Sequence, residues 1–214
     1  MRVWLGRLVL AANVGALALV VWVLLRAQGP LGRSISEHKA NARVSQMLRQ
    51  EWERLASAPR VDSCAGQVRL VEFSDYSCPF CRQQHAILKR LSPCAGVAYR
   101  HYPSPAHSRA EGAALAAICA DRQGRFLAMH TRLFESDTWQ STGDWASEAA
   151  AAGIPRIPEF LACLRSPGAQ ARLAEDREYG RRLGVAGTPT FLHRGGRVSG
   201  LLDDSALRRS AQVK

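Results

Sequence analysis

The longest apolar run of the chain lies near its N-terminus. Leu8–Leu25 is an unbroken stretch of 18 residues in which only Asn13 is strongly polar. At about 1.5 Å per residue, a helix of this length spans roughly 27 Å, which is close to the hydrocarbon thickness of a bilayer. A cleaved signal peptide has a shorter apolar run, and the small-x-small sequence Ala16-Leu17-Ala18 lies in the middle of this one. The pattern therefore predicts an uncleaved transmembrane signal anchor over residues 1–26.

A narrower apolar stripe follows the anchor. Ser34 and Glu37 have the spacing of a capping box, and Pro59 ends the helical pattern that follows. The stripe consists of Val44, Met47, Leu48, Trp52 and Leu55. We predict a helical stalk over residues 27–60. It is either a spacer or a self-association helix, and the narrow stripe favours the spacer.

The pattern changes to that of a mixed α/β domain after residue 60. Val68–Phe73 has the composition of a short buried strand, and Ser74 to Ser77 form a turn. A helix then begins at Cys78 and ends at Ser92-Pro93; its apolar positions are Phe80, Ile87, Leu88 and Leu91. Further along, two helices are predicted at Ala110–Ala120 and Pro158–Leu164.

The C-terminal part of the domain predicts a hairpin and a helix. Thr190–Arg194 and Arg197–Ser199 flank Gly195-Gly196, and a helical pattern starts at about Asp203. Thr188-Pro189 immediately precedes the first of these strands.

Composition limits the possible classes of protein. The chain has 214 residues, 47% of them hydrophobic and 22% charged, which excludes a disordered chain and a polytopic membrane protein. The net charge is +11. Residues 1–60 hold 9 basic and 3 acidic side chains, and residues 61–214 hold 20 basic and 15 acidic ones. The excess of basic residues is thus spread along the chain, and no nucleic-acid recognition motif accompanies it. We therefore expect no nucleic-acid partner.

The sequence Cys78-Pro79-Phe80-Cys81 carries the candidate chemistry. Pro79 suits the first position of a helix, so Cys78 lies at a helix N-terminus, where backbone N–H groups and the helix dipole stabilise a thiolate. Cys81, one turn later, can form a disulfide with it. A zinc site would need two further ligands, and no second CxxC or HxxxH lies at usable spacing. A copper-binding assembly factor that uses the same two cysteines is the alternative from another class.

Two segments resemble one known family. Glu72–His85, with the sequence EFSDYSCPFCRQQH, is similar to the active-site segment of the DsbA-like (DsbA/DsbG-type) thiol–disulfide oxidoreductases. Gly184–Phe191 resembles their cis-proline loop, and the likeness covers roughly residues 61–210. It implies an α/β thioredoxin fold over residues 61–214 with a helical insertion at about 104–184. The anchor and the stalk lie outside the match.

The resemblance also implies the roles of individual residues. Cys78 matches the nucleophile of the family and Cys81 the resolving thiol, so the two form the redox disulfide and no further cofactor or metal is expected. Pro189 matches the cis-proline. The peptide group of Thr188 would pair with the substrate backbone.

Three polar residues near the motif have more than one interpretation. Glu72 matches a buried acid of the family that transfers protons to and from Cys81; otherwise it is an edge carboxylate that keeps the strand soluble. We expect Asp75 to be an exposed turn residue and His85 an ordinary residue of the helix surface.

Phe80 is a departure from the family pattern. The strongest oxidases of the family have His between the cysteines, whereas Phe80 neither donates a hydrogen bond nor carries charge. We therefore expect a less extreme thiolate pKa and a less oxidising disulfide. The direction of the reaction (disulfide formation, isomerisation or reduction) stays open.

The other four cysteines form two candidate structural disulfides. Cys64 precedes the strand that leads to the site and Cys94 ends the helix that leaves it, so both should lie at the opposite end of the domain and can pair. Some anchored relatives have a second disulfide in the insertion, which Cys119–Cys163 would match; otherwise Cys119 is a buried free thiol. Fully paired cysteines are typical of an oxidising compartment.

Together these expectations describe a single-pass protein of the bacterial inner membrane with its catalytic domain on the periplasmic side. Its expected partners are unfolded or misoxidised exported proteins. A membrane redox partner would reoxidise or reduce the Cys78–Cys81 pair.

Overall fold

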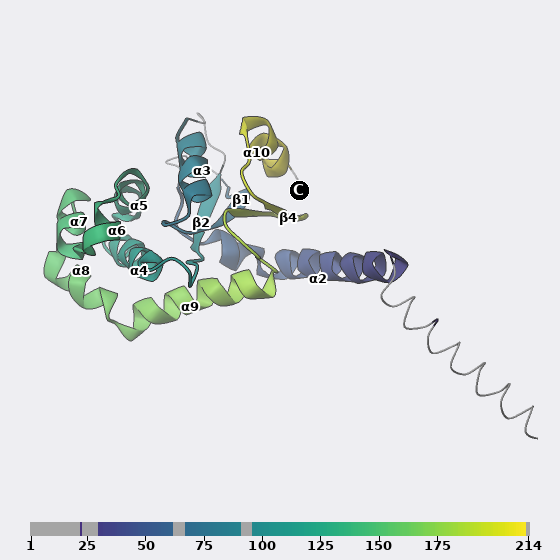
Figure 1. The fold of residues 1–214 in the computed structure, drawn as a ribbon, viewed down its shortest axis with the longest axis horizontal. Coiled ribbons are helices and arrows are strands. Elements are labelled where there is room, and N and C mark those ends of the chain that lie inside the picture. The colour runs from purple at the N-terminus through teal and green to yellow at the C-terminus, as the bar shows by residue number, and fades with distance from the viewer. Residues whose placement is uncertain (1–21, 23–29, 62–66, 91–95, 213–214) are drawn as a thin grey trace, which may run out of the picture. The chain divides into compact units, whose positions relative to one another are not determined.

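The structure is a computed structural model of the chain and describes residues 22, 30–61, 67–90 and 96–212 (Figure 1). Apart from Trp22, the predicted anchor lies outside the described residues, and so do Cys64 and Cys94 with their predicted disulfide. In the described part, no helix is both long enough and apolar enough to span a bilayer. The transmembrane anchor over residues 1–26 therefore stays a prediction.

Helix α2 spans Pro30–Ala56, and its final turns belong to the compact unit of residues 45–214. Leu48, Trp52 and Leu55, three members of the predicted apolar stripe, are buried in the second unit. The final turns of the predicted stalk thus belong to the compact domain, which begins before residue 61. Burial within one chain accounts for these three side chains without a second copy.

The domain is built on a four-stranded sheet in the order β2-β1-β3-β4. The strands are β1 (Leu70–Ser74), β2 (Val97–His101), β3 (Thr190–His193) and β4 (Gly196–Ser199). β1 is parallel to β2 and antiparallel to β3, and β3 forms the predicted hairpin with β4. The outer side of β2 is covered by the segment after α2, because Tyr99 N–H donates to the Pro59 carbonyl at 2.8 Å and Val61 N–H donates to the Val97 carbonyl at 3.1 Å. β1 is therefore a central strand.

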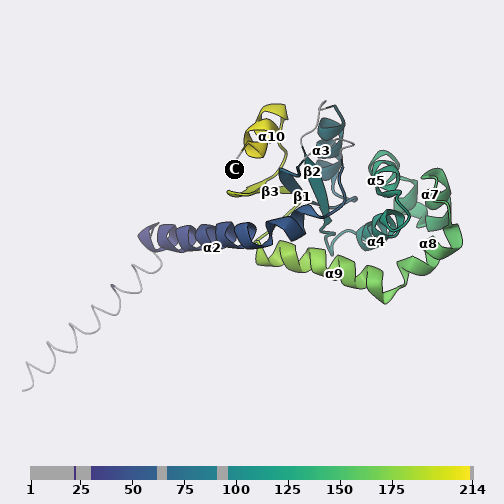
Figure 2. The same ribbon diagram turned by 180° about the vertical axis from the view of Figure 1, so that it is seen from behind.

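Helices cover both faces of this sheet. Figures 1 and 2 show α3 (Pro79–Arg90) and α10 (Asp204–Ala211) on one side and α9 (Pro167–Arg182) on the other. Gln84 of α3 connects the first two, because its side chain donates to the Leu202 carbonyl at 3.1 Å and accepts from the Leu202 N–H at 2.8 Å. These two bonds attach α3 to the segment that joins β4 to α10.

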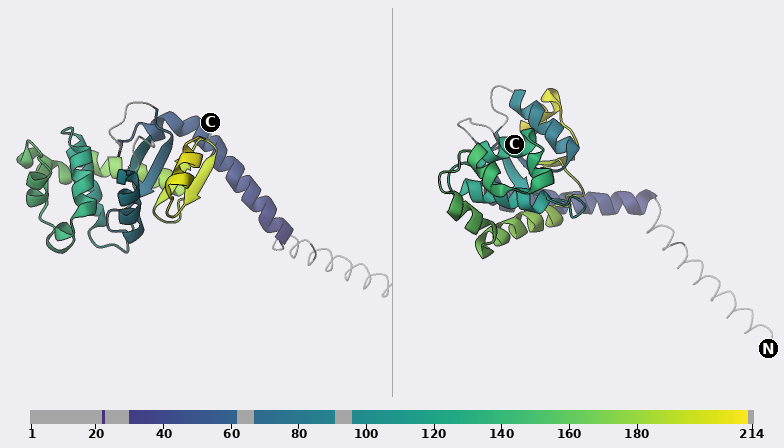
Figure 3. Two further views of the ribbon diagram at one scale, coloured as in Figure 1. Left: turned by 90° about the horizontal axis from the view of Figure 1, so that it is seen from above. Right: turned by 60° about the vertical axis from the view of Figure 1, so that its left-hand side comes forward.

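The helices between β2 and β3 form the predicted insertion (Figure 3). They are α4 (Ala110–Asp121), α5 (Phe126–Glu135), α6 (Thr138–Thr142), α7 (Trp145–Ala151), α8 (Ile157–Leu164) and α9. α4 is at their centre: all of its alanines are buried, and their small side chains let the neighbouring helices approach closely. Gly112 shows how close: a Cβ there would lie 2.6 Å from the Trp145 ring. The Ala-rich sequence of α4 is therefore a packing requirement.

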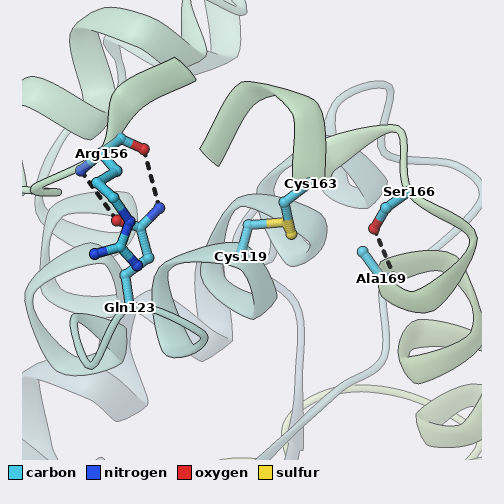
Figure 4. The surroundings of a disulfide bond; sticks show 6 residues. All are labelled: Cys119, Gln123, Arg156, Cys163, Ser166 and Ala169. Atoms are coloured by element: carbon cyan, nitrogen blue, oxygen red, sulfur yellow. Dashed lines mark hydrogen bonds between the residues drawn. A yellow bond between two sulfur atoms is a disulfide. The ribbon is translucent and has the colours of Figure 1, made fainter. Parts of the chain in front are cut away.

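Helix α8 is attached to α4 at both of its ends (Figure 4). Cys119 of α4 and Cys163 of α8 form a disulfide with an S–S distance of 2.03 Å, so the structure contains the second predicted bridge. At the other end of α8, Gln123 Nε2 donates to the Arg156 carbonyl and Gln123 Oε1 accepts from the Arg156 N–H, both at 3.0 Å. The insertion is thus joined by covalent and polar contacts as well as by apolar packing.

One buried ion pair joins the insertion to the sheet. Arg100 of β2 donates to Asp176 of α9 at 2.8 Å, and the two side chains are 2% and 0% exposed. Arg100 Nε also donates to the Leu55 carbonyl at 3.2 Å, and the other Asp176 oxygen accepts the His101 N–H at 3.0 Å. Buried charges persist only when they are paired and hydrogen-bonded, so this cluster fixes α9 and the end of α2 on the same face.

We expect Asp176→Ala to lower the free energy of unfolding by about 3–5 kcal/mol, because it leaves the buried Arg100 guanidinium without its carboxylate. The measurement is urea denaturation of the full-length chain. Glu175→Ala is the matched control: Glu175 pairs with Arg172 as Asp176 does, but its side chain is 50% exposed. It should cost less than about 1 kcal/mol. Equal losses in the two variants would contradict this account.

Candidate active site

Both cysteines of the CPFC sequence lie where β1 passes into α3. α3 begins at Pro79, so Cys78 is the residue before its first turn and Cys81 lies within that turn. Cys78 N–H donates to the Asp75 carbonyl at 3.1 Å, which closes the turn between strand and helix. Both thiols are free and buried. The structure thus brings the two predicted redox residues together at the N-terminus of a helix.

The environment of Cys78 favours its thiolate. The Cys81 thiol donates to the Cys78 sulfur, and the backbone N–H groups of Cys81 and Phe80 also contribute. These donors outweigh burial and lower the Cys78 pKa from 9.0 to about 5. A thiolate is the reactive form of cysteine, so Cys78 is the nucleophile of the pair.

Cys81 has the opposite electrostatic environment. Burial is the main cause that raises its pKa far above the ordinary value of 9.0, and the bond that it donates to Cys78 and the charge of Glu72 add to the shift. At neutral pH, Cys81 is therefore a protonated thiol. To act as a nucleophile or to leave as a thiolate, it needs a nearby group that exchanges a proton with it.

Two buried carboxyl groups precede this pair in the sequence, Glu72 and Asp75. The Asp75 carboxylate already accepts three hydrogen bonds, so Glu72 is the candidate for exchanging a proton with Cys81. Glu72 lies on the central strand β1 and is 2% exposed, so the interpretation as an edge carboxylate is wrong. Burial raises its pKa from 4.5 to about 7; the nearby Cys78 adds to this rise, and the Ser74 hydroxyl partly offsets it. A carboxyl group with this pKa can give or take a proton at neutral pH.

The Thr188-Pro189 loop lies against Cys78. The peptide bond between Thr188 and Pro189 is cis, and the Cys78 thiol donates to the Thr188 carbonyl at 3.4 Å. A carbonyl oxygen only accepts, so this bond exists in the thiol form of Cys78 and not in the thiolate form. The structure thus joins two segments that are 110 residues apart in the sequence.

A groove of about 430 Å³ begins beside Thr188. One wall is the loop Val185–Thr188 and the other is the loop Tyr102–Pro105 that follows β2. Arg177 and Arg181 of α9 complete the lining. Since Thr188 also contacts Cys78, a polypeptide in this groove would lie next to the nucleophile.

Phe80 does not occupy the position that the helical pattern predicted. Its side chain is 57% exposed, although the spacing placed it among the apolar positions of the helix. A residue in the first turn points past the end of the sheet, so helical periodicity does not determine its burial. The low pKa of Cys78 is also reached without a polar side chain here, mainly because the Cys81 thiol donates to the Cys78 sulfur; the backbone N–H of Phe80 adds a smaller contribution.

Asp75 and His85 both differ from the expectation that they are surface residues. Asp75 is 1% exposed, and its carboxylate accepts three hydrogen bonds, one from its own turn and two from the connection between β2 and α4. His85 packs against the rings of His130 and Phe134, with centroids 5.1 and 5.0 Å away, and burial lowers its pKa. α5 covers this side of α3, which the local sequence of α3 does not reveal.

A buried group of aromatic and histidine side chains behind Cys81 was not predicted. Tyr76 stacks on Tyr99 with ring centroids 5.3 Å apart, and the Tyr76 hydroxyl lies 3.1 Å from His130 Nδ1. His101 lies beside Tyr99 at 5.1 Å. Burial lowers the pKa of His101 to about 4 and that of His130 well below 6.5, so both are neutral. The alternation of Tyr99 and His101 along a strand is the only sequence signal that could have indicated this group.

No metal centre is visible in the described part of the chain. There, no three or more His, Cys, Asp and Glu side chains are grouped so that they could hold a metal ion. The copper-binding alternative therefore has no additional ligands among these residues.

Comparison with known proteins assigns a family to this fold. The family model described as Thioredoxin matches residues 63–211. The structure is similar to that of a linker-deletion mutant of Proteus mirabilis ScsC, with a TM-score of 0.70 and 22% sequence identity over 94% of each chain. It is also similar to the thiol-disulfide exchange protein α-DsbA2 of Wolbachia pipientis, with a TM-score of 0.65 and 18% identity over 80% of this chain and 95% of that one. The predicted thioredoxin fold with a helical insertion is confirmed.

Curated relatives match the chain over part of their own length. The Na(+)/H(+) antiporter NhaA 3 of Salinispora tropica is 31% identical over 93% of this chain, and NhaA 1 of Salinispora arenicola is 35% identical over 65% of it. These alignments cover 31% and 22% of the antiporters. The chain thus spans less than a third of the length of these relatives.

We expect Cys78 to ionise near pH 5, which alkylation rates or thiolate absorbance measured against pH will show. Cys81→Ala removes the thiol donor and should move this midpoint up towards 9.0. Cys81→Ser is the matched control: its hydroxyl still donates, so the midpoint should stay low. The same midpoint in both variants would mean that the Cys81 thiol does not stabilise the thiolate.

Proposed function

Since the chain belongs to the thioredoxin family, we propose that it catalyses thiol–disulfide exchange on exported proteins, with the Cys78–Cys81 pair as its only redox group. The observation that carries this proposal is the pair of free thiols at the start of α3, whose pKa values are shifted in opposite directions beside the Thr188-Pro189 loop. One thiol is prepared to attack or to leave, and the other holds its proton until the second step.

Disulfide donation would take two steps. A substrate thiolate attacks Cys78 Sγ of the oxidised protein, the Cys78–Cys81 bond breaks, and Cys81 leaves as a thiolate that takes up a proton. A second substrate thiolate then attacks the substrate sulfur of the mixed disulfide and releases Cys78. The substrate loses two electrons, which the Cys78–Cys81 pair gains. Its two thiol protons are released when its thiolates form; Cys81 takes up one, and the other stays in the solvent because Cys78 is released as a thiolate. The same steps in reverse reduce a substrate, and an alternation of both isomerises it.

The low pKa of Cys78 favours the donating direction. In the folded reduced protein, Cys78 is a thiolate from about pH 5 upwards, whereas an ordinary cysteine ionises only near pH 9.0. The folded reduced form therefore gains stability as the pH rises from 5 towards 9.0, and this stabilisation is lost as the pH falls through 5. A stable reduced form makes the disulfide a stronger oxidant. We therefore expect a reduction potential nearer to about −120 mV than to about −270 mV.

Glu72 is proposed as the proton acceptor and donor for Cys81. Protonated below about pH 7, it can give a proton to the Cys81 thiolate as that group leaves. Ionised above about pH 7, it can take the Cys81 proton when Cys81 attacks a mixed disulfide. Its charge also contributes to the raised pKa of Cys81, which supports proximity of the two groups.

We also propose that the domain works outside the cytoplasm, at the membrane. The Cys119–Cys163 disulfide supports an oxidising compartment, because such bonds are rare in the cytosol. The apolar run Leu8–Leu25 supports an anchor in the bacterial inner membrane. A redox partner in the same membrane would return the Cys78–Cys81 pair to its working state.

Mixed disulfides test the exchange reaction directly. Cys81→Ala should accumulate a covalent adduct between Cys78 and a disulfide-containing peptide, because the thiol that resolves the adduct is missing. Cys78→Ala should form none, since the remaining thiol is buried and protonated. Mass spectrometry of the adducts is the measurement. A protein that forms no adduct, or that forms it at Cys81, would refute the proposed function.

Glu72→Gln should slow the release of the mixed disulfide by roughly 10²-fold, because positioned general acids and bases contribute about that much. The rise of the release rate through about pH 7 should disappear as well. Stability provides an independent readout. In the wild type, Glu72 ionises near pH 4.5 in the unfolded state but only near pH 7 in the folded state. The free energy of unfolding therefore falls as the pH rises from 4.5 to 7. Thermal unfolding of Glu72→Gln should lack that fall.

A further inference from the structure

Asp75 is a buried carboxylate at the end of the strand that leads to Cys78. It accepts hydrogen bonds from Ser77 N–H at 2.9 Å, from Ser104 N–H at 2.9 Å and from His107 Nδ1 at 2.6 Å. The donors come from two segments: the turn before Cys78, which holds Ser77, and the connection between β2 and α4, which holds Ser104 and His107. A carboxylate accepts only, so Nδ1 carries the hydrogen of the His107 ring.

The first contact shapes the turn of the nucleophile. The Asp75 side chain accepts from the N–H two residues later, and its backbone carbonyl accepts from Cys78 N–H at 3.1 Å. This is the pattern by which an Asp fixes a tight turn, and it aims Cys78 at the N-terminus of α3. For that purpose the bond from Ser77 would be sufficient, and the carboxylate could stay exposed.

The other two contacts reach the wall of the groove. Ser104 lies in the loop Tyr102–Pro105, which lines the groove beside Thr188. His107 follows this loop, and its carbonyl accepts the N–H of Ala110, where α4 begins. The carboxylate of Asp75 therefore holds one groove wall and the first residues of the insertion against the turn of Cys78.

Tyr102 completes a closed circuit around the nucleophile. Its N–H donates to the Ser74 carbonyl at 2.8 Å, and its hydroxyl donates to the Val185 carbonyl at 3.2 Å. Val185 belongs to the opposite wall, which ends at Thr188 next to Cys78. Both walls are thus fixed relative to Cys78, one through Asp75 and the other through Tyr102.

From this geometry we infer that Asp75 and His107 are a positioning pair for thiol–disulfide exchange, which holds the substrate groove in register with the Cys78 sulfur. The inference rests on the proposed function and adds two residues that do not touch the reacting atoms. His107 fixes the groove wall. Asp75 fixes the wall and the turn of the nucleophile together. Substrates that fill the groove depend on both residues, whereas small disulfides and alkylating reagents depend only on the turn.

The test compares a peptide with small reagents. His107→Leu should lower kcat/KM for a disulfide-containing peptide roughly ten-fold, mainly through KM, because displacement of a positioning group by about 1 Å has effects of this size or larger. Reaction with oxidised glutathione and alkylation by iodoacetamide should stay at wild-type rates, since the bonds from Ser77 and Cys78 to Asp75 remain. His107→Asn should restore the peptide reaction, because its amide nitrogen can donate from the position of Nδ1.

Asp75→Ala should affect both kinds of reaction. It removes both carboxylate oxygens, Oδ1 that accepts from Ser77 and Oδ2 that accepts from Ser104 and His107, so the wall and the turn both shift. We expect a ten-fold or larger loss of kcat/KM with the peptide and, in addition, a higher alkylation midpoint for Cys78.

The matched control for His107→Leu is His193→Leu. His193 is a half-buried histidine at the end of β3 away from Pro189, and its replacement should change none of these rates.

The possible outcomes separate the two proposals. A wild-type protein that exchanges with neither the peptide nor glutathione would refute the proposed function itself. Normal exchange in the wild type with an unchanged peptide rate in His107→Leu would overturn the positioning pair alone. Equal losses of the rates with the peptide and with glutathione in His107→Leu would also overturn it. The same holds for a peptide rate that falls in parallel with the thermal unfolding temperature of the variant and that His107→Asn does not restore.

Discussion

The start of α3 must present a set of hydrogen-bond donors to a single sulfur atom, and the site depends on this constraint. The Cys81 thiol and two backbone N–H groups stabilise the Cys78 thiolate, which requires that the helix begins at Pro79 and that Cys81 lies one turn later. The same bond makes Cys81 harder to ionise. This bond lowers the Cys78 pKa and adds to the effect of burial, which is the main cause of the raised Cys81 pKa. Displacement of α3 would weaken the contribution of the bond to both shifts.

The remainder of the domain keeps this helix end in place by polar contacts between buried groups. Gln84 attaches α3 to the approach of α10, and Asp75 closes the turn before Cys78. Arg100 and Asp176 join the sheet to α9 and to the end of α2. Each of these groups is buried, so each is stable only with all its partners in place. Apolar packing alone would allow the elements to slide; these contacts set their register.

The helical insertion contributes to the site as well as covering the sheet. α5 supplies His130 and Phe134, which close over the aromatic residues behind Cys81. The loops at the two ends of the insertion form the walls of the groove beside Thr188. The disulfide between α4 and α8 lies within the insertion and joins two of its helices (Figure 4).

The sequence by itself determined the elements around the cysteines, the C-terminal hairpin and the chemistry of the cysteines. Strand, helix and hairpin patterns are local, and a CxxC sequence at a predicted helix start already implies a reactive thiol, because the helix dipole is a local property. Tertiary structure decided how far other polar side chains are buried. Asp75 and His85 have ordinary surroundings in the sequence, but the loop after β2 contacts the buried Asp75, and α5 packs on the half-buried His85. For Glu72, the central position of β1 decided between the two interpretations. Burial, partners and pKa depend on contacts between residues far apart in the chain, which local periodicity does not encode.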